Sequence, residues 1–509
     1  MSGIQRLSSA ILPTLKAAGK VATPKFNPKD IKPGILHLGV GNFHRSHVAA
    51  YMNDLFNNDA LVESHKDWGI VGGGIMHFDD AKRKQLEPQD WMQTLVEIDA
   101  DGTKPQLLTS MIDFLPVDHE GKKHEALQDM LMKVKIVSLT VTEGGYYLND
   151  GKFDLEHAHI QHDIANPDSP QTIFGMMLKA LKLRREAGVA PFTVMSCDNI
   201  PHNGKVVEGV VVGLAKEMYD EEFVAWLKDN VAFPNSMVDR ITPATTESQK
   251  KFVKDNYGYE DDAPIFCEPY RQWVLEDNFT DGRPEFEKID PSITFVDDVA
   301  PYELMKIRIL NGGHASLSYP AALLSLEYDH DAMEHPLIGK FLDIVEKTEI
   351  IPTIPPVPDT DLADYWKLIN SRFSNPAMGD TIGRNTYDGA SRQPKFIVPV
   401  AADALKKGTK VDGLALVSAM WCRYCQGTVE NGDEVPSKDP QWDRLTATAE
   451  EAKTNPAAWL AMEDVYGAVG QDPVFQEAFA KALNTINSKG VEAALQQYID
   501  ENESFAAAA

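Results

Sequence analysis

The length of 509 residues, with 43% hydrophobic and 25% charged side chains, allows two or three domains with buried cores. The 49 basic and 76 acidic residues leave a net charge of -27 at pH 7, which repels nucleic-acid phosphates and anionic membrane surfaces. We therefore expect neither nucleic acid nor a membrane as a partner.

The N-terminal stretch MSGIQRLSSAILPTLKAAGK lacks a long apolar run, and no later segment has roughly 18 consecutive apolar residues. Four cysteines are too few to indicate a disulfide framework in a chain of this size. We expect a cytoplasmic protein, with a mitochondrial presequence left open because the first stretch is basic and contains no acid. No long exposed apolar helix calls for a partner, so we expect a monomer.

The N-terminal half alternates short apolar runs with amphipathic helical stretches. Runs that are apolar on both faces and separated by helices predict a buried parallel sheet, here an α/β doubly wound fold of the Rossmann type. Predicted strands lie at 34–41, 68–74, 134–141 and 192–199, with helices at 44–56 and 172–188. The apolar run 264–277 is predicted as a strand that enters a turn at Pro269.

After about residue 295 the pattern changes to long helical segments. These are predicted at 303–319, 335–348 and 412–425, with a proline-rich interruption at 350–360. We therefore expect a Rossmann-type dinucleotide-binding domain over 1–295 and a mainly α-helical substrate and catalytic domain over 296–509.

Gly39 and Gly41 lie between an apolar strand and the start of a predicted helix. Glycine lets the backbone approach a pyrophosphate, and a helix N-terminus supplies free N–H groups. His44 occupies the position of the third glycine of the usual G-x-G-x-x-G motif, so the motif alone is weak. The alternative is a tight strand-to-helix turn. We place Gly39, Gly41, Asn42 and Phe43 in a cofactor-binding turn.

Asp79 and Asp80 follow the second predicted strand, where a carboxylate meets the adenosine ribose in a doubly wound fold. An acid at this place favours NAD and repels the 2′-phosphate of NADP. We select Asp79 for this contact, while His77 and Lys82 leave some tolerance of NADP open. The alternative for each aspartate is a helix N-cap.

Lys306, Asn311 and His314 lie on one predicted helix, YELMKIRILNGGHASLSY. At about 100° per residue they project at roughly 0°, 140° and 80°, which places them on one face. Partial desolvation lowers the pKa of a lysine and makes it an effective base near neutral pH. The alternative is structural, with a lysine that reaches solvent from a helix edge and polar partners that satisfy the backbone.

Asn199 ends an apolar strand in MSCDNIPHNG, and ligands bind at the carboxyl ends of strands in open α/β sheets. Two side-chain amides, Asn199 and Asn311, could stabilise a reacting oxygen without a metal. The alternative for Asn199 is a turn before Pro201.

Short motifs along the chain together resemble those of the polyol-specific long-chain dehydrogenases. In chain order they are GVGNFHRSH, TVTEGGYY, SCDNIPHNG, SMVDRITP, EPYRQWVLED, KIRILNGGH and RFSNPAMGDT. The resemblance covers roughly residues 30 to 480. It implies a Rossmann-type domain with a helical second domain, NAD as cofactor, a polyol or ketose substrate, and hydride transfer without a catalytic metal.

The resemblance also implies roles for individual residues. Lys306 corresponds to the general acid/base, Asn199 and Asn311 to the amides that hold the C2 oxygen, and His314 to a histidine that binds substrate hydroxyls. Further matches are the substrate-binding Arg384 and Asp239, Arg392 in place of a family lysine, and Glu143 as a proton relay. Arg384 could instead be an exposed helix cation, and Glu143 could instead form a buried turn.

The motifs identify the family more specifically than they identify the substrate. We expect interconversion of D-mannitol and D-fructose, with arabinitol or sorbitol dehydrogenases and fructuronate or tagaturonate reductases as alternatives. Arg392 keeps a sugar acid open because it adds a cation. An alternative from a different functional class is a regulatory protein that kept nucleotide binding and lost catalysis. The lone pair Cys422 and Cys425 and the H-x-x-H of His44 and His47 do not indicate a metal site.

Overall fold

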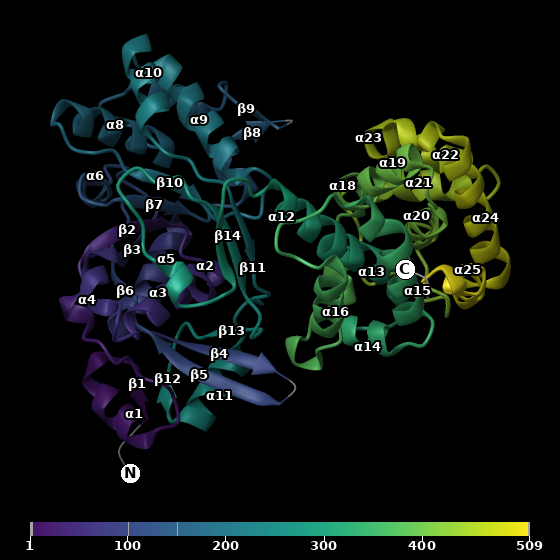
Figure 1. The fold of residues 1–509 in the computed structure, drawn as a ribbon, viewed down its shortest axis with the longest axis horizontal. Coiled ribbons are helices and arrows are strands. Elements are labelled where there is room, and N and C mark those ends of the chain that lie inside the picture. The colour runs from purple at the N-terminus through teal and green to yellow at the C-terminus, as the bar shows by residue number, and fades with distance from the viewer. Residues whose placement is uncertain (1–3, 100, 150, 507–509) are drawn as a thin grey trace. The chain divides into compact units, whose positions relative to one another are not determined.

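The computed structural model describes residues 4–99, 101–149 and 151–506. The chain divides into two compact units, Met1–Ala300 and Pro301–Ala509. Figure 1 labels most of their helices and strands.

The first unit contains a five-stranded parallel sheet with the order β10-β7-β2-β3-β6. Its strands are β2 (Pro33–Leu38), β3 (Gly69–Gly73), β6 (Met111–Phe114), β7 (Ile136–Leu139) and β10 (Thr193–Ser196). The chain adds strands first on one side of β2 and then on the other, so the order reverses between β2 and β7. Ligands bind at such a switch point, beyond the carboxyl ends of the strands. The doubly wound fold predicted from the apolar runs is confirmed.

Helices cover both faces of this sheet. Adjacent strand residues point to opposite faces, so Ile35 packs toward α3 (Val48–Phe56), whereas Leu36 packs toward α8 (Ile173–Glu186) and α9 (Asn203–Met218). Figure 1 shows α8 and α9 beside β7 and β10. Further helices of this unit are α1 (Leu12–Ala18), α2 (Asn42–Ser46), α4 (Val62–His65), α5 (His77–Leu86), α6 (Glu125–Leu131), α7 (Ala158–Ala165), α10 (Glu221–Asn230) and α11 (Glu247–Tyr257).

Besides the two-stranded pairs of β1 (Gln5–Arg6) with β12 (Tyr259–Glu260) and of β8 (Leu148–Asn149) with β9 (Lys152–Phe153), the first unit contains two three-stranded sheets. One contains β11 (Ser236–Asp239), β14 (Gln272–Glu276) and β15 (Ile293–Val296), and the other contains β13 (Ile265–Cys267), β4 (Gln93–Asp99) and β5 (Gly102–Leu108). The run 264–277 therefore forms two strands, β13 and β14, that belong to different sheets. The turn at Pro269 separates them.

The second unit is built mainly of helices around α13 (Gly312–Leu323). Almost every residue of α13 is buried, and the helix packs against α15 (Ile338–Val345), α17 (Ile382–Thr386), α18 (Gly389–Phe396) and α20 (Asp412–Tyr424). Other helices here are α12 (Ala300–Met305), α14 (Asp329–Glu334), α16 (Leu362–Phe373), α19 (Val398–Lys407), α21 (Trp442–Ala452), α22 (Ala457–Leu460), α23 (Glu463–Tyr466), α24 (Pro473–Lys489) and α25 (Val491–Ala506). The predicted helical character of this part of the chain is confirmed.

Among the described residues, no helix is both long enough and apolar enough to cross a bilayer.

Candidate active site

The glycine turn follows β2 at the switch point of the sheet. Gly39 has φ 90°, and a Cβ there would lie 2.1 Å from the backbone oxygen of Thr140, so no other residue fits. Gly41 differs, because it is exposed and a Cβ there would meet nothing closer than the Gly39 oxygen at 4.0 Å. Packing within the protein therefore does not require glycine at 41. A missing side chain at an exposed turn leaves room for a ligand, which favours a cofactor turn over a turn of purely structural origin.

The residues after Gly41 have partners inside the first unit. Asn42 Nδ2 donates to the Pro243 oxygen at 3.0 Å, and Asn42 Oδ1 accepts from Arg45 at 2.5 Å. Asn42 thus offers a ligand its backbone rather than its side chain. The ring of Phe43 stacks on that of His47 at 4.8 Å.

His44, at the position of the third glycine, is buried and stacks on His37 with 3.3 Å between ring centroids. Burial lowers the pKa of His37 to about 3. Burial, followed by the nearby basic side chains of His37, Arg45 and His47, lowers the pKa of His44, so both rings are neutral at physiological pH. A neutral imidazole stack replaces the close helix-to-strand contact that a glycine would allow.

Asp79 lies in the first turn of α5, just after β3. Its Oδ2 accepts from the backbone N–H groups of Ile75 at 3.0 Å and Met76 at 2.9 Å. Burial is the largest influence on this carboxyl and raises its pKa. Asp79 is not the N-cap, which is Met76, but as the third residue of α5 it bonds back to the N-cap backbone and so stabilises the start of the helix. Contact of the same carboxylate with a ribose stays a prediction.

The carboxyl ends of neighbouring parallel strands bring three predicted elements to one edge of the sheet. The glycine turn follows β2, Glu143 opens the short helical turn after β7, and Asn199 follows β10, while the sheet order is β10-β7-β2. Glu143 and Asn199 are both exposed at this edge. Asp239 ends β11 and is buried.

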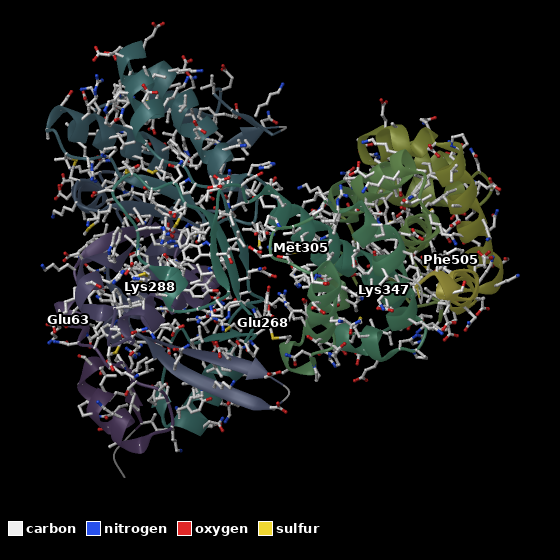
Figure 2. The ribbon with its side chains drawn as sticks, in the orientation of Figure 1. Glu63, Glu268, Lys288, Met305, Lys347 and Phe505 are labelled. Carbon is white, nitrogen blue, oxygen red and sulfur yellow. The ribbon has the colours of Figure 1, made fainter. Side chains whose placement is uncertain are left out.

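In the second unit, Lys306 and Asn311 are the first and last residues of a π-helical segment, η7 (Lys306–Asn311), between α12 and α13. The angles predicted for a regular α-helix are therefore wrong. Hydrogen bonds that join i and i+5 widen the turn, so two residues five apart lie closer to one face than the α-helical angle allows. Met305, labelled in Figure 2, directly precedes Lys306. The π turn therefore explains how Lys306 and Asn311, five residues apart, can face one site.

Lys306 is buried, with 7% of its surface exposed. Oδ1 of Asn311 is also buried and has no hydrogen-bond partner among the described residues. A buried polar atom without a partner costs free energy, and a ligand is one group that would satisfy it.

His314 lies at the centre of a polar network. Its Nε2 is 3.2 Å from Asp329 Oδ2 and 3.9 Å from Asp380 Oδ2, and its ring packs on Phe373 at 4.3 Å. Asn385 Nδ2 donates to both oxygens of Asp329, at 3.1 and 3.0 Å. Asp329 and Asp380 were missed from the sequence, because nothing local connects these distant aspartates with His314.

The two predicted substrate-binding arginines extend this network. Arg384 Nε donates to Asp380 Oδ1 at 2.8 Å, although 58% of the arginine side chain is exposed. Arg392 Nη1 donates to the backbone oxygen of Asn385 at 2.9 Å. Both arginines are therefore linked to His314, one through Asp380 and the other through Asn385 and Asp329.

One group of potential metal ligands occurs among the described residues, since atoms of His314, Asp329 and Asp380 lie within 4.8 Å of one another. Both carboxylates already have partners, Asn385 for Asp329 and Arg384 for Asp380. A cation would have to compete with the Arg384 guanidinium for Asp380.

Glu346 is a buried acid that the sequence analysis missed. Neither carboxyl oxygen has a hydrogen-bond partner among the described residues, and burial raises its pKa well above the ordinary value. It opens a second π-helical segment, η8 (Glu346–Ile350), which packs against η7, and a Cβ on Gly313 would lie 3.0 Å from its Oε1. Its neighbour Lys347 is labelled in Figure 2. The sequence did contain a signal for this burial, because the helical spacing of 338–349 places Glu346 on the apolar face.

Replacing Glu346 by glutamine is expected to reduce the loss of stability as pH rises. Because the carboxyl pKa is raised on folding from 4.5, this group's contribution to stability is fully present below about pH 4.5 and is lost as pH rises toward the folded-state pKa. The loss approaches about 1.4 kcal/mol per pH unit. Urea unfolding from about pH 5 to about pH 8 measures it.

Glutamine mimics the protonated acid and cannot ionise, so the free energy of unfolding of the variant should depend less on pH. Glu334→Gln, at an exposed position, is the control and should retain the wild-type slope. Parallel pH dependences for Glu346→Gln and the wild type would show that Glu346 does not titrate abnormally.

A doubly wound sheet with an open glycine turn, followed by a helical unit with a buried lysine, defines the class of Rossmann-type dehydrogenases. Residues 33–288 match the family model of the mannitol dehydrogenase Rossmann domain, and residues 298–487 match that of the mannitol dehydrogenase C-terminal domain. The chain belongs to the mannitol dehydrogenase family, which confirms the resemblance inferred from the motifs.

Relatives match over nearly the whole chain. A mannitol 2-dehydrogenase of Cereibacter sphaeroides is 50% identical over 481 residues, which are 94% of this chain and 99% of the relative. The ternary complex of Pseudomonas fluorescens mannitol 2-dehydrogenase with NAD and D-mannitol is 37% identical, has a TM-score of 0.82, and covers 98% of this chain and 100% of its own. A substrate-free D-sorbitol dehydrogenase is 34% identical and has a TM-score of 0.87. It covers 96% of this chain and 100% of its own.

Proposed function

We propose that this protein is an NAD-dependent mannitol 2-dehydrogenase that interconverts D-mannitol and D-fructose. The match of both units to a mannitol 2-dehydrogenase solved with NAD and D-mannitol carries this proposal. It agrees with the 50% identity to another mannitol 2-dehydrogenase along 94% of the chain. The exposed Gly41, where a Cβ would meet no atom closer than 4.0 Å, leaves room for the approach of a dinucleotide.

NAD, when bound, accepts the hydride that leaves C2 of the polyol. The protein itself handles the proton and the oxygen. Lys306 takes the proton of the C2 hydroxyl during oxidation and returns it during reduction, while the amides of Asn199 and Asn311 donate hydrogen bonds to the C2 oxygen. Glu143 exchanges the proton with solvent, a role that suits its exposed position.

His314, Asp239, Arg384 and Arg392 bind the remaining hydroxyls of the substrate in this proposal. The Asp329 carboxylate lies 3.2 Å from His314 Nε2, but this nitrogen has no hydrogen-bond partner among the described residues, which leaves it available to a substrate hydroxyl. Arg384 and Arg392 are held by Asp380 and Asn385, so they are preorganised rather than free to reorient.

We also propose that the enzyme needs no catalytic metal and acts as a cytoplasmic monomer. All four cysteines are buried free thiols, as suits a reducing compartment. Size-exclusion chromatography with light scattering measures the oligomeric state.

The test follows NADH oxidation with D-fructose after treatment with a chelator. We expect rapid turnover that resists the chelator, and slower turnover with NADPH because Asp79 repels a 2′-phosphate. Loss of activity on chelation, restored by a divalent cation, would overturn the metal-free mechanism. Absence of turnover with fructose would overturn the proposed substrate.

D-sorbitol is the second candidate, because the D-sorbitol dehydrogenase structure matches with a TM-score of 0.87. NAD reduction with D-sorbitol and D-mannitol in parallel decides between them. Fructuronate and tagaturonate belong in the same assay, because Arg392 could pair with a sugar carboxylate.

A further inference from the structure

Asp198 directly precedes Asn199 and is buried at the carboxyl end of β10. Its carboxylate accepts three hydrogen bonds from the segment that follows β7. Oδ2 accepts from Val141 N–H at 3.0 Å and from the Tyr146 hydroxyl at 2.7 Å, and Oδ1 accepts from Thr142 N–H at 2.9 Å. One carboxylate therefore ties the residue before Asn199 to both ends of the turn that contains Glu143.

That turn begins from a strained backbone. Thr142 has φ 63° and ψ 168°, a region used almost exclusively by glycine. Such a conformation persists only when surrounding contacts impose it. The two backbone N–H groups bound to Asp198 are those of Thr142 itself and of the residue before it, so the carboxylate is placed to impose this conformation.

The backbone of Asp198 is tied to a third strand. Asn203 Nδ2 donates to the backbone oxygen of Asp198 at 3.0 Å and to the backbone oxygen of Ser236 at 2.8 Å. Asn203 Oδ1 accepts from the backbone N–H of Ser236 at 2.9 Å. Ser236 begins β11, the strand that ends with Asp239. The hydrogen bonds of Asp198 and Asn203 thus connect the segments that contain Glu143, Asn199 and Asp239.

We infer that Asp198 is a positioning residue that fixes Glu143, the proton relay, relative to Asn199, the amide that holds the reacting oxygen. This inference rests on the proposed function, which supplies the roles of Glu143 and Asn199. Asp198 acts through the turn at Thr142 and not by contact with substrate.

An amide cannot replace this carboxylate. Asparagine has one acceptor oxygen and one NH₂ group, so in either orientation its NH₂ faces a backbone N–H of Val141 or Thr142. Without these bonds, Thr142 is expected to relax to an ordinary conformation and to move Glu143. Displacement of a reacting group by about 1 Å lowers turnover by about 10²-fold.

The test combines loss of the carboxylate with relief of the strain. Asp198→Asn should lower kcat by about 10²-fold, and Tyr146→Phe, which removes one of the three bonds, should lower it less. Thr142→Gly should leave the wild type nearly unchanged and should restore much of kcat in the Asp198→Asn background, because glycine adopts φ 63° without strain. Ser325→Gly, which relieves a similar φ of 62° elsewhere, is the matched control and should restore nothing.

Hydrogen exchange measured by mass spectrometry over residues 141–146 gives a readout that needs no substrate. Asp198→Asn should accelerate exchange there, and added Thr142→Gly should slow it again. Normal kcat in Asp198→Asn, or loss of kcat that Thr142→Gly does not restore, would overturn the positioning role. If the wild type fails to reduce fructose, the proposed function is wrong, whatever the exchange experiment shows. Unchanged hydrogen exchange in Asp198→Asn would show that the Asp198 carboxylate does not hold the turn at Thr142.

Discussion

Replacing Lys306 by alanine is expected to lower kcat for ketose reduction by about 10²- to 10⁴-fold, the usual contribution of a general acid/base. Lys306 is buried at the start of the π turn, so solvent would not readily replace its ammonium group. Steady-state NADH oxidation measures the effect. The KM for NADH should change little, because Lys306 is proposed to act on the substrate oxygen and not to bind the cofactor.

Two further observations separate loss of proton transfer from loss of structure. The ionisation that controls kcat/KM in the wild type should disappear from the pH profile of Lys306→Ala, and small primary amines in the buffer should restore part of the rate. Lys367→Ala, at an exposed lysine of the same unit, is the control and should behave as the wild type. Near-normal turnover of Lys306→Ala would contradict the assignment.

Replacing Asn199 or Asn311 by alanine is expected to lower kcat by about 10²- to 10³-fold each, as for removal of a single donor to a developing oxyanion. Asn311 has a buried amide oxygen without a partner, whereas Asn199 is exposed at the edge of the sheet. Both variants should affect kcat more than KM, because a charged oxygen needs the donors more than a neutral hydroxyl does.

The double variant tests whether the two amides hold the same oxygen. If they do, the combined loss should be smaller than the product of the two single losses, because residues that act as a unit are not additive. Independent, multiplicative effects would contradict a shared oxygen. Asn256→Ala is a surface control, since its amide binds only the neighbouring Phe252 oxygen among the described contacts.

The sheet could be predicted because its information is local. In the four strands predicted from the sequence, a run that is apolar on both faces requires burial between two layers of helices. Ile35 and Leu36 show this directly, since they belong to the cores on opposite faces. Gly39 was recognised for a similar reason, because a glycine directly after an apolar run is visible in the sequence.

The candidate site could be predicted only in part. Lys306, Asn311 and His314 emerged because they share one short segment, but a regular α-helix was the wrong geometry for it. The π turn packs against the second π segment that begins at Glu346, and such a contact between distant segments leaves no pattern in residues 303–319. Asp79 was found in the sequence, but its role could not be decided there, because an aspartate suits both a bond to the start of a helix and a contact with a ribose.

By itself, the sequence determined the Rossmann-type sheet, the helical second part and the residue types at the site, because strand alternation, helix spacing and glycine turns are properties of neighbouring residues. Only the tertiary structure decided the partners of His314 and the contacts of Asp198. Each of these depends on side chains from segments far apart in the chain, and hydrogen bonding between them leaves no local pattern in either segment.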